Sequence, residues 1–191
     1  FNDASFSHQG VTSTFKRKDG GYYVNTQAAS GEYQDFRIDY TFGVEPLQQY
    51  LIRFSGGRLQ ALTIAWDSRP NEQSGQRWYQ LMPDYLGEPG ESLHWTGAYY
   101  NWNSRCAECH STGLEKNYSM ATNTYATAFA EINVACEACH GPGKKHIEWL
   151  GRDNTTSKKD EGMGLVNAVQ TLQWRFAEGE SIAHPIGQIS E

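Results

Sequence analysis

Alternation of hydrophobic and polar positions runs through the first third of the chain. It is clearest over residues 36–42, where Phe, Ile, Tyr and Phe alternate with Arg, Asp and Thr, and a period of two predicts a strand with one buried face. Two further pairs of apolar segments flank glycine-containing turns and predict two hairpins: 11–16 with 22–26, and 50–54 with 59–66. The pattern therefore predicts a small antiparallel sheet.

The pattern changes after this sheet. Residues 70–103 show turn chemistry without sustained periodicity, and so long a segment without regular structure is uncommon unless a bound partner supplies its apolar contacts. Short helices are expected over residues 104–150. Apolar residues at helical spacing then predict one amphipathic helix that ends near Gly179, followed by an extended tail. These apolar residues are Leu165, Val169, Leu172 and Phe176.

Two short motifs carry the chemistry. They are Cys106-Ala107-Glu108-Cys109-His110 and Cys136-Glu137-Ala138-Cys139-His140, and together they use every cysteine of the chain. Thiols three positions apart can bond to both vinyl-derived carbons of one porphyrin, and the histidine that follows can ligate the iron. The sequence therefore predicts two covalently attached haem c groups.

The cysteine pairs also have other interpretations. Two Cys-x-x-Cys pairs could form a four-thiolate zinc ribbon, although a ribbon needs no histidine after each pair. Two structural disulfides would suit an exported protein, and a thioredoxin-like redox site would need only one pair. Because both pairs are followed by histidine, the motifs favour haem over zinc, and zinc over disulfides.

The second axial position of each iron decides the function. Histidine at both distal positions would close the irons to substrates and favour electron transfer. His146 is the preferred distal candidate, because the turn at residues 141–143 carries it away from its own haem; the alternative is a solvated basic stretch. His8 and His94 lie among aromatic residues suited to a haem edge, or are ordinary partly buried histidines. His184 is expected to be exposed in the tail.

Two further axial possibilities follow from the composition. Methionine would raise the reduction potential, and the chain offers Met82, Met120 and Met163. An open iron would instead indicate a haem enzyme, or an enzyme subunit, that acts on nitrogen compounds. Such enzymes often carry a lysine-type or otherwise modified attachment motif, and neither motif of this sequence is modified. We therefore expect an electron-transfer protein rather than an enzyme.

Charge and hydropathy exclude several classes of partner. The formal charge of −6 at 191 residues argues against a nucleic-acid partner, and basic patches interleaved with aromatics are absent from the sequence. The sequence contains no apolar run that approaches the roughly 20 residues needed to span a bilayer. The amino end lacks a secretory pattern, so we expect any export signal to have been removed.

Several longer runs resemble one family. They are residues 40–51, 65–70, 94–97 and 101–103, and the second motif with its Gly141-Pro142-Gly143 turn and His146. These runs resemble the exported multihaem c-type cytochromes that often carry tetratricopeptide repeats, over about residues 1–149. The resemblance implies a periplasmic or surface electron carrier with closely packed haems, and histidines matching His8, His94 and His146. Family members typically have a further haem motif upstream and helical repeats downstream, so the chain is expected to be a fragment or a shortened two-haem subunit.

Together these observations predict an α+β fold. A small antiparallel β region, 1–85, is followed by a loop-rich region with short helices that binds two haems, 86–150, and by a C-terminal amphipathic helix and tail, 151–191, within one compact unit. The expected function is electron transfer in the periplasm or outside the cell. The expected partners are other redox proteins, and copies of this chain in an oligomer or filament with haem contacts between subunits.

Overall fold

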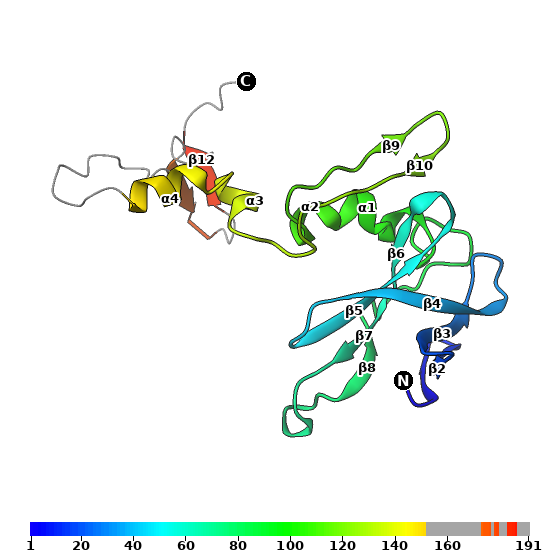
Figure 1. Ribbon diagram of the computed structural model, residues 1–191. Helices are drawn as coiled ribbons and strands as arrows, with labels where there is room; N and C mark the ends of the chain where they lie inside the picture. Colours follow the sequence, from blue (N-terminus) through cyan, green and yellow to red (C-terminus); the bar gives the residue numbers. More distant parts are fainter. Residues whose placement is uncertain (152–172, 177, 180–182, 187–191) are drawn as a thin grey trace. The chain divides into compact units, whose positions relative to one another are not determined.

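The computed structural model describes residues 1–151, 173–176, 178–179 and 183–186 (Figure 1). The chain divides into two compact units. Unit 1 comprises residues 1–109 and 114–128, and unit 2 comprises residues 110–113 and 129–191. The boundary passes through the first Cys-x-x-Cys-His motif, so that its two thiols belong to unit 1 and its histidine to unit 2.

Unit 1 is built around one antiparallel sheet of eight strands (Figure 1). The strands are β1 (Ala4–His8), β2 (Val11–Lys18), β3 (Gly21–Gln27), β4 (Tyr33–Phe42), β5 (Leu47–Arg53), β6 (Leu59–Ala61), β7 (Ile64–Asp67) and β8 (Arg77–Gln80). The hydrogen-bonded order is β1-β2-β3-β4-β5-β7-β8, and β6 pairs with β5. β5 thus pairs with β7 near its start and with β6 near its end.

The predicted hairpins and the central strand are confirmed. Between β2 and β3, Asp19 and Gly20 both adopt positive φ, 49° and 74°, which is the geometry of a type I′ turn and explains the Asp-Gly pair. Lys18 and Gly21 face each other across this turn. The alternating segment 36–42 lies within β4, and segments 50–54 and 59–66 contribute to β5, β6 and β7.

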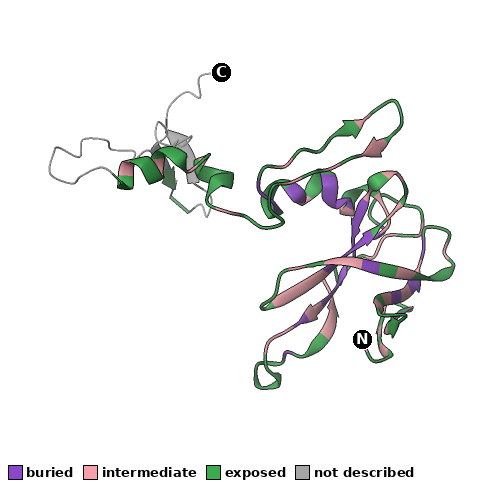
Figure 2. Cartoon of the chain, viewed as in Figure 1, coloured by how far each residue is buried: buried purple, intermediate pink, exposed green. Residues whose placement is uncertain are grey.

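Side chains from several strands form one hydrophobic core in unit 1, and Figure 2 shows buried positions in purple along these strands. Its buried members are Phe15, Val24, Ile38, Tyr50, Ile52, Leu62, Ile64 and Trp95. The sheet curls so that its edges approach: the ring of Phe1 lies 5.5 Å from that of Trp78 on β8, and His8 on β1 donates a hydrogen bond from Nε2 to the Pro83 carbonyl at 2.8 Å.

Short elements complete the described part of the chain. In unit 1 they are η1 (Ser55–Gly57), η2 (Asn71–Gln73), η3 (Ala98–Tyr100), α1 (Trp102–Arg105), β9 (Tyr118–Ser119) and β10 (Thr124–Tyr125), with α2 (Ala107–His110) ending in unit 2. Unit 2 adds α3 (Glu137–His140), α4 (Lys144–Leu150), β11 (Gln173–Phe176) and β12 (Ala183–Ile186).

The predicted α+β class is wrong, because the described chain is mostly β. The sheet extends at both edges beyond the predicted small sheet, through β1 and through β8, which lies in the segment expected to lack regular structure. β8 is only four residues long and none of its positions is fully buried. Its sequence therefore shows no alternation of buried and exposed positions from which a strand could be predicted. Its pairing with β7 fixes it instead.

The predicted C-terminal helix is also corrected at its end. Phe176 lies in β11, which pairs with β12 in an antiparallel hairpin, and the positive φ of Gly179, 82°, lies between the two strands. Helical spacing of apolar residues was therefore misleading here, because hydrogen bonding to a later segment decided the conformation. The other residues of that prediction, Leu165, Val169 and Leu172, lie outside the described residues. Residues 183–186 of the predicted tail are extended.

Candidate haem-attachment sites

The first pair of thiols lies on one helical turn. The Asn101 side chain accepts a hydrogen bond from the Ser104 N–H at 3.1 Å and caps α1. The Cys106 N–H bonds to the Trp102 carbonyl and the Cys109 N–H to the Cys106 carbonyl, each at 3.1 Å. Residues three apart in such a turn share one face, so both sulfurs are available on the same side.

Burial separates the two thiols of this motif. Cys106 is half-buried and Cys109 is exposed. Burial raises the pKa of Cys106, and the neighbouring Cys109 adds to the effect. Cys106 therefore stays protonated at neutral pH, which makes it a poor free nucleophile.

Asn103 anchors the segment that leads into the first motif. It is fully buried, and its Oδ1 accepts the Leu59 N–H at 2.7 Å. Its Nδ2 donates to the Gly57 carbonyl at 3.2 Å and to Thr127 Oγ1 at 2.8 Å. One side chain thus joins α1 to the start of β6 and to the chain that follows β10.

Two buried side chains complete the attachment of this segment to the sheet. Trp102 on α1 and Ala107 on α2 are 1% and 0% exposed, and Figure 2 shows buried positions along these short helices. Gln60 on β6 donates from Nε2 to the Trp95 carbonyl at 2.9 Å and to the Gly97 carbonyl. The first motif is therefore fixed by its own buried Ala107 together with side chains that lie outside the motif.

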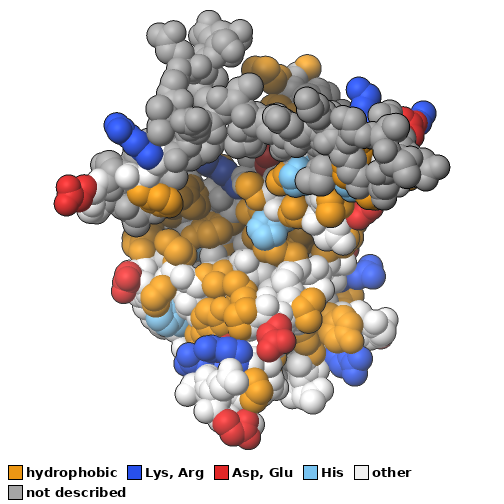
Figure 3. Space-filling view, turned by 90° about the vertical axis from the view of Figure 1, so that its left-hand side faces the viewer, with side chains coloured by type: hydrophobic (Ala, Val, Ile, Leu, Met, Phe, Trp, Pro, Cys, Tyr) orange, Lys and Arg blue, Asp and Glu red, His pale blue; other side chains and the backbone are white. Residues whose placement is uncertain are grey.

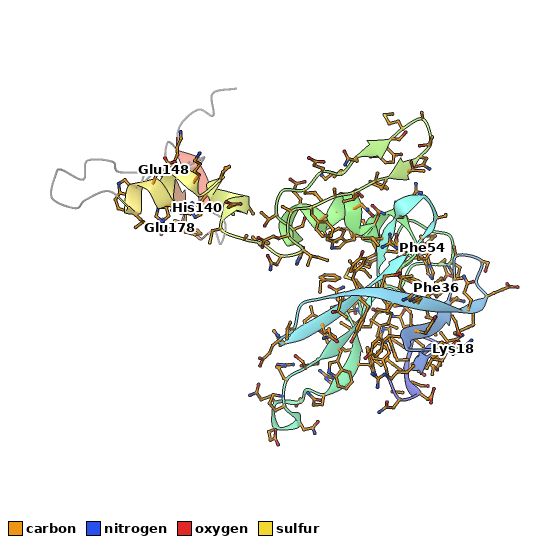
Figure 4. The ribbon with its side chains drawn as sticks, in the orientation of Figure 1. Lys18, Phe36, Phe54, His140, Glu148 and Glu178 are labelled. Atoms are coloured by element: carbon orange, nitrogen blue, oxygen red, sulfur yellow. The ribbon has the colours of Figure 1, made fainter. Side chains whose placement is uncertain are left out.

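The second motif lies on α3 in unit 2, where Figure 4 labels His140. The N–H groups of Cys139 and His140 bond to the Cys136 carbonyl at 3.3 and 2.9 Å, so these thiols also share one turn. Glu137 Oε1 accepts the Gly143 N–H at 3.1 Å. This bond closes the Gly-Pro-Gly turn between α3 and α4 and gives the Glu137 carboxylate a structural role.

Thr112 connects the residues that follow the first motif with the residues that precede the second. It is 5% exposed and belongs to unit 2. Its hydroxyl donates to the Asn133 carbonyl and accepts the Ala135 N–H, each at 2.8 Å, while its N–H donates to the Glu131 carbonyl at 2.9 Å. Because Cys136 follows directly, chain geometry holds the backbones of His110 and Cys136 within about 20 Å of each other.

The preferred distal candidate lies close to the second motif in sequence and in the same unit. His146 is on α4, half-buried, with its ring 6.1 Å from that of Trp149 and nearly parallel to it at 12°. The turn between the helices contains Gly141 at a φ of 70°. The role of His146 as an iron ligand stays a prediction.

His8 and His94, far apart in sequence, line the same small pocket of unit 1. His94 is 4% exposed, and its Nδ1 lies 2.7 Å from Thr96 Oγ1. Burial lowers the pKa of His94, which favours the neutral imidazole that iron requires. The pocket, about 40 Å³, is the size of one or two water molecules.

His8 already uses one ring nitrogen. A carbonyl oxygen can only accept, so His8 Nε2 carries the proton in its 2.8 Å contact with the Pro83 carbonyl. Ligation of iron through Nε2 would require this bond to break. The fourth candidate, His184, pairs with Arg175 across the β11–β12 hairpin through its backbone; its side chain lies outside the description.

The residues of both motifs fit covalent haem. All four cysteines are free thiols, and three of them are exposed. Within either unit, the described residues form no group of three or more His, Cys, Asp or Glu side chains suited to another metal ion. A pair of thiols on one turn with histidine immediately after it is the arrangement that a c-type haem needs.

Comparison with known families agrees with this chemistry. Residues 71–141 match the family described as cytochrome c554 and c-prime, and this segment contains both motifs. The match supports a c-type cytochrome. No curated protein and no solved structure matches the chain. None of the helices in the described residues has both the length and the apolar character that a membrane span requires.

Sequence reasoning missed the residues that position the motifs. Asn103 belongs to a run that carries the family resemblance, but only the fold shows which groups it joins. Thr112 lies two residues after the first motif and gives no signal in the sequence, because its partners are some twenty residues away. Glu108, like Glu137, has a structural partner: Lys116 lies 2.9 Å from its carboxylate.

Proposed function

We propose that this chain is a two-haem c-type cytochrome that carries electrons outside the cytoplasm. The observation that carries the proposal is the pair of complete motifs, each with its thiols on one turn and a histidine at the end of that turn. A bound haem supplies an iron that alternates between the ferrous and ferric states.

The chain's own residues would hold and separate the two cofactors. Cys106 and Cys109 would fasten one haem and Cys136 and Cys139 the other, while His110 and His140 would ligate the irons. The bonds of Thr112 join the residues just after His110 to the residues just before Cys136.

The distal ligands decide between a carrier and an enzyme. We propose histidine at both distal positions, with His146, His94 and His8 as candidates. Two such ligands close both irons to substrates. Exposure of oxidised and reduced protein to carbon monoxide tests this: little change in the visible spectrum supports a carrier, whereas strong binding shows an open iron and favours an enzyme.

Covalent attachment is tested by mass spectrometry and a visible spectrum of the exported protein. We expect the mass of two haems, and the loss of one of them in the double variant Cys136→Ala, Cys139→Ala. The double variant Cys106→Ala, Cys109→Ala is the matched control and is expected to retain the other haem. A colourless protein with stoichiometric zinc would refute the proposal.

The partner is proposed to be another redox protein or a further copy of this chain. The thiols and the histidine of the second motif are all exposed, which leaves a haem attached there accessible to a partner. Sedimentation of the haem-loaded protein over a range of concentrations distinguishes the two: self-association supports contacts between copies, and a strict monomer supports a separate partner protein.

A further inference from the structure

A cleft in unit 1 opens between the turn that joins β1 to β2 and the loop at residues 85–89. We call it the loop cleft; its lining residues are Gln9, Gly10, Val11, Gln27, Tyr85, Leu86, Gly87, Glu88 and Pro89. It measures about 400 Å³, and small-molecule sites commonly measure roughly 300–1,000 Å³. The size of the cleft therefore suits an organic group rather than a single ion.

Hydrogen bonds hold both walls of the loop cleft. Gln9 Nε2 donates to the Pro83 carbonyl at 2.7 Å. Glu91 Oε2 accepts the Tyr85 hydroxyl at 2.7 Å and the Glu88 N–H at 3.1 Å. One carboxylate thus fixes two lining residues, so the cleft is formed before any ligand binds and little ordering is needed on binding.

The polar side chains that line the loop cleft have unused acceptors. Gln9 Nε2 donates to the Pro83 carbonyl, as described above. Gln27 Nε2 donates to the Gly31 carbonyl at 3.2 Å. A carbonyl oxygen can only accept, so these bonds fix the orientation of both side-chain amides. Within the described part of the chain, neither glutamine Oε1 accepts a hydrogen bond, and nor does the Glu88 carboxylate.

The charges around the loop cleft favour a cation. Of the described residues that line it, Glu88 alone is charged. Residues 78–104 include Asp84, Glu88 and Glu91 but neither lysine nor arginine. Elsewhere the surface carries charges of both signs, as the blue and red side chains in Figure 3 show. His94 lines the pocket that shares four residues with this cleft, and it stays neutral because burial lowers its pKa.

A primary ammonium group matches this set of side chains. It carries a positive charge for the Glu88 carboxylate and N–H donors that the Oε1 atoms of Gln9 and Gln27 can accept. A quaternary ammonium has the charge but no donors, so these acceptors would lose their water without compensation. The cleft offers one carboxylate, whereas a Ca²⁺ ion takes about six to eight oxygen ligands.

We propose that the loop cleft binds a primary ammonium group at the end of an organic chain. The proposal does not depend on haem attachment, because none of the residues that line the cleft belongs to either motif. The same chemistry occurs in a free diamine and in the lysine side chain of a partner protein.

Isothermal titration calorimetry of the haem-loaded protein tests the proposal. The probe is 1,5-diaminopentane, and it is compared with its analogue that has a trimethylammonium group at each end. The analogue keeps both charges but has no N–H donor, so we expect it to bind about tenfold more weakly. Equal binding of the two would indicate only general attraction to an acidic protein and would overturn the proposal. Absence of diamine binding would also overturn it.

A short peptide with one lysine distinguishes the two sources of the ammonium group. The control peptide has the same sequence with its lysine side chain acetylated, which removes the charge. If the lysine peptide binds more tightly than the diamine, and the acetylated peptide does not bind, the ligand is a partner protein. If the diamine binds more tightly than the lysine peptide, the ligand is a free amine.

Variants locate the binding in this cleft. Glu88→Gln removes the charge and keeps the shape, and is expected to weaken diamine binding about tenfold. Glu88→Asp, which keeps the charge, is expected to weaken it less. Glu72→Gln is the matched control, because Glu72 is an exposed glutamate on η2 that does not line the cleft, and the affinity is expected to stay unchanged. Circular dichroism verifies that each variant is folded. A folded Glu88→Gln protein with unaltered affinity would refute the assignment.

Discussion

Replacement of Thr112 by valine tests whether its hydroxyl joins the segment after the first motif to the segment before the second. Valine has nearly the same shape, so the substitution removes only the hydrogen bonds to the Asn133 carbonyl and from the Ala135 N–H, both 2.8 Å long. Thr112 is 5% exposed, and Ala135 is half-buried. At about 1 kcal/mol for each bond, the variant is expected to lose about 2 kcal/mol of unfolding free energy.

Two measurements follow this loss in the haem-loaded protein. Urea denaturation gives the change in unfolding free energy, and hydrogen exchange reports on the Ala135 amide directly. The Ala135 N–H donates to the Thr112 hydroxyl, so its exchange is expected to accelerate in Thr112→Val. Thr112→Ser keeps the hydroxyl and is expected to restore most of the protection.

Thr122→Val is the matched control, because the Thr122 hydroxyl is exposed and bonds to the Thr124 hydroxyl on the same short segment. Exposed substitutions usually change stability by less than about 0.5 kcal/mol. If Thr112→Val were as stable as this control, and the Ala135 amide exchanged at the wild-type rate, the two hydrogen bonds of the Thr112 hydroxyl would not contribute to stability and the prediction would be wrong.

Three further predictions concern other residues. Asn103→Asp removes two donors from a fully buried group and is expected to cost about 3 kcal/mol of unfolding free energy, measured in urea; wild-type stability would contradict this. Arg69 lowers the pKa of Asp67 from 3.8 to about 2, so the Asp67 carboxylate stabilises the fold above pH 4 and loses this effect as the pH falls towards 2. In an acid titration followed by circular dichroism, Asp67→Asn is therefore expected to lose less stability than the wild type between these pH values. His146→Ala is expected to let the reduced protein bind carbon monoxide at one iron, whereas an unchanged spectrum would exclude His146 as a ligand.

Local signals in the chain were reliable where neighbouring residues decide the structure. The Asp-Gly turn after β2 requires positive φ, and alternation over 36–42 needs only one buried face, so both were predictable. The same holds for each Cys-x-x-Cys-His motif, because one helical turn brings both thiols to one side without help from distant residues.

Tertiary structure decided what depends on partners far away in the chain. β8 and β11 carry no clear period, and pairing with β7 and β12 makes them strands. His8 and His94 share a pocket only because the sheet curls. The sequence alone therefore determined that each motif sets two thiols and a histidine on one turn, since that geometry is local. The fold determined what anchors the chain beside each motif, since Asn103 and Thr112 act through hydrogen bonds to residues more than twenty positions away.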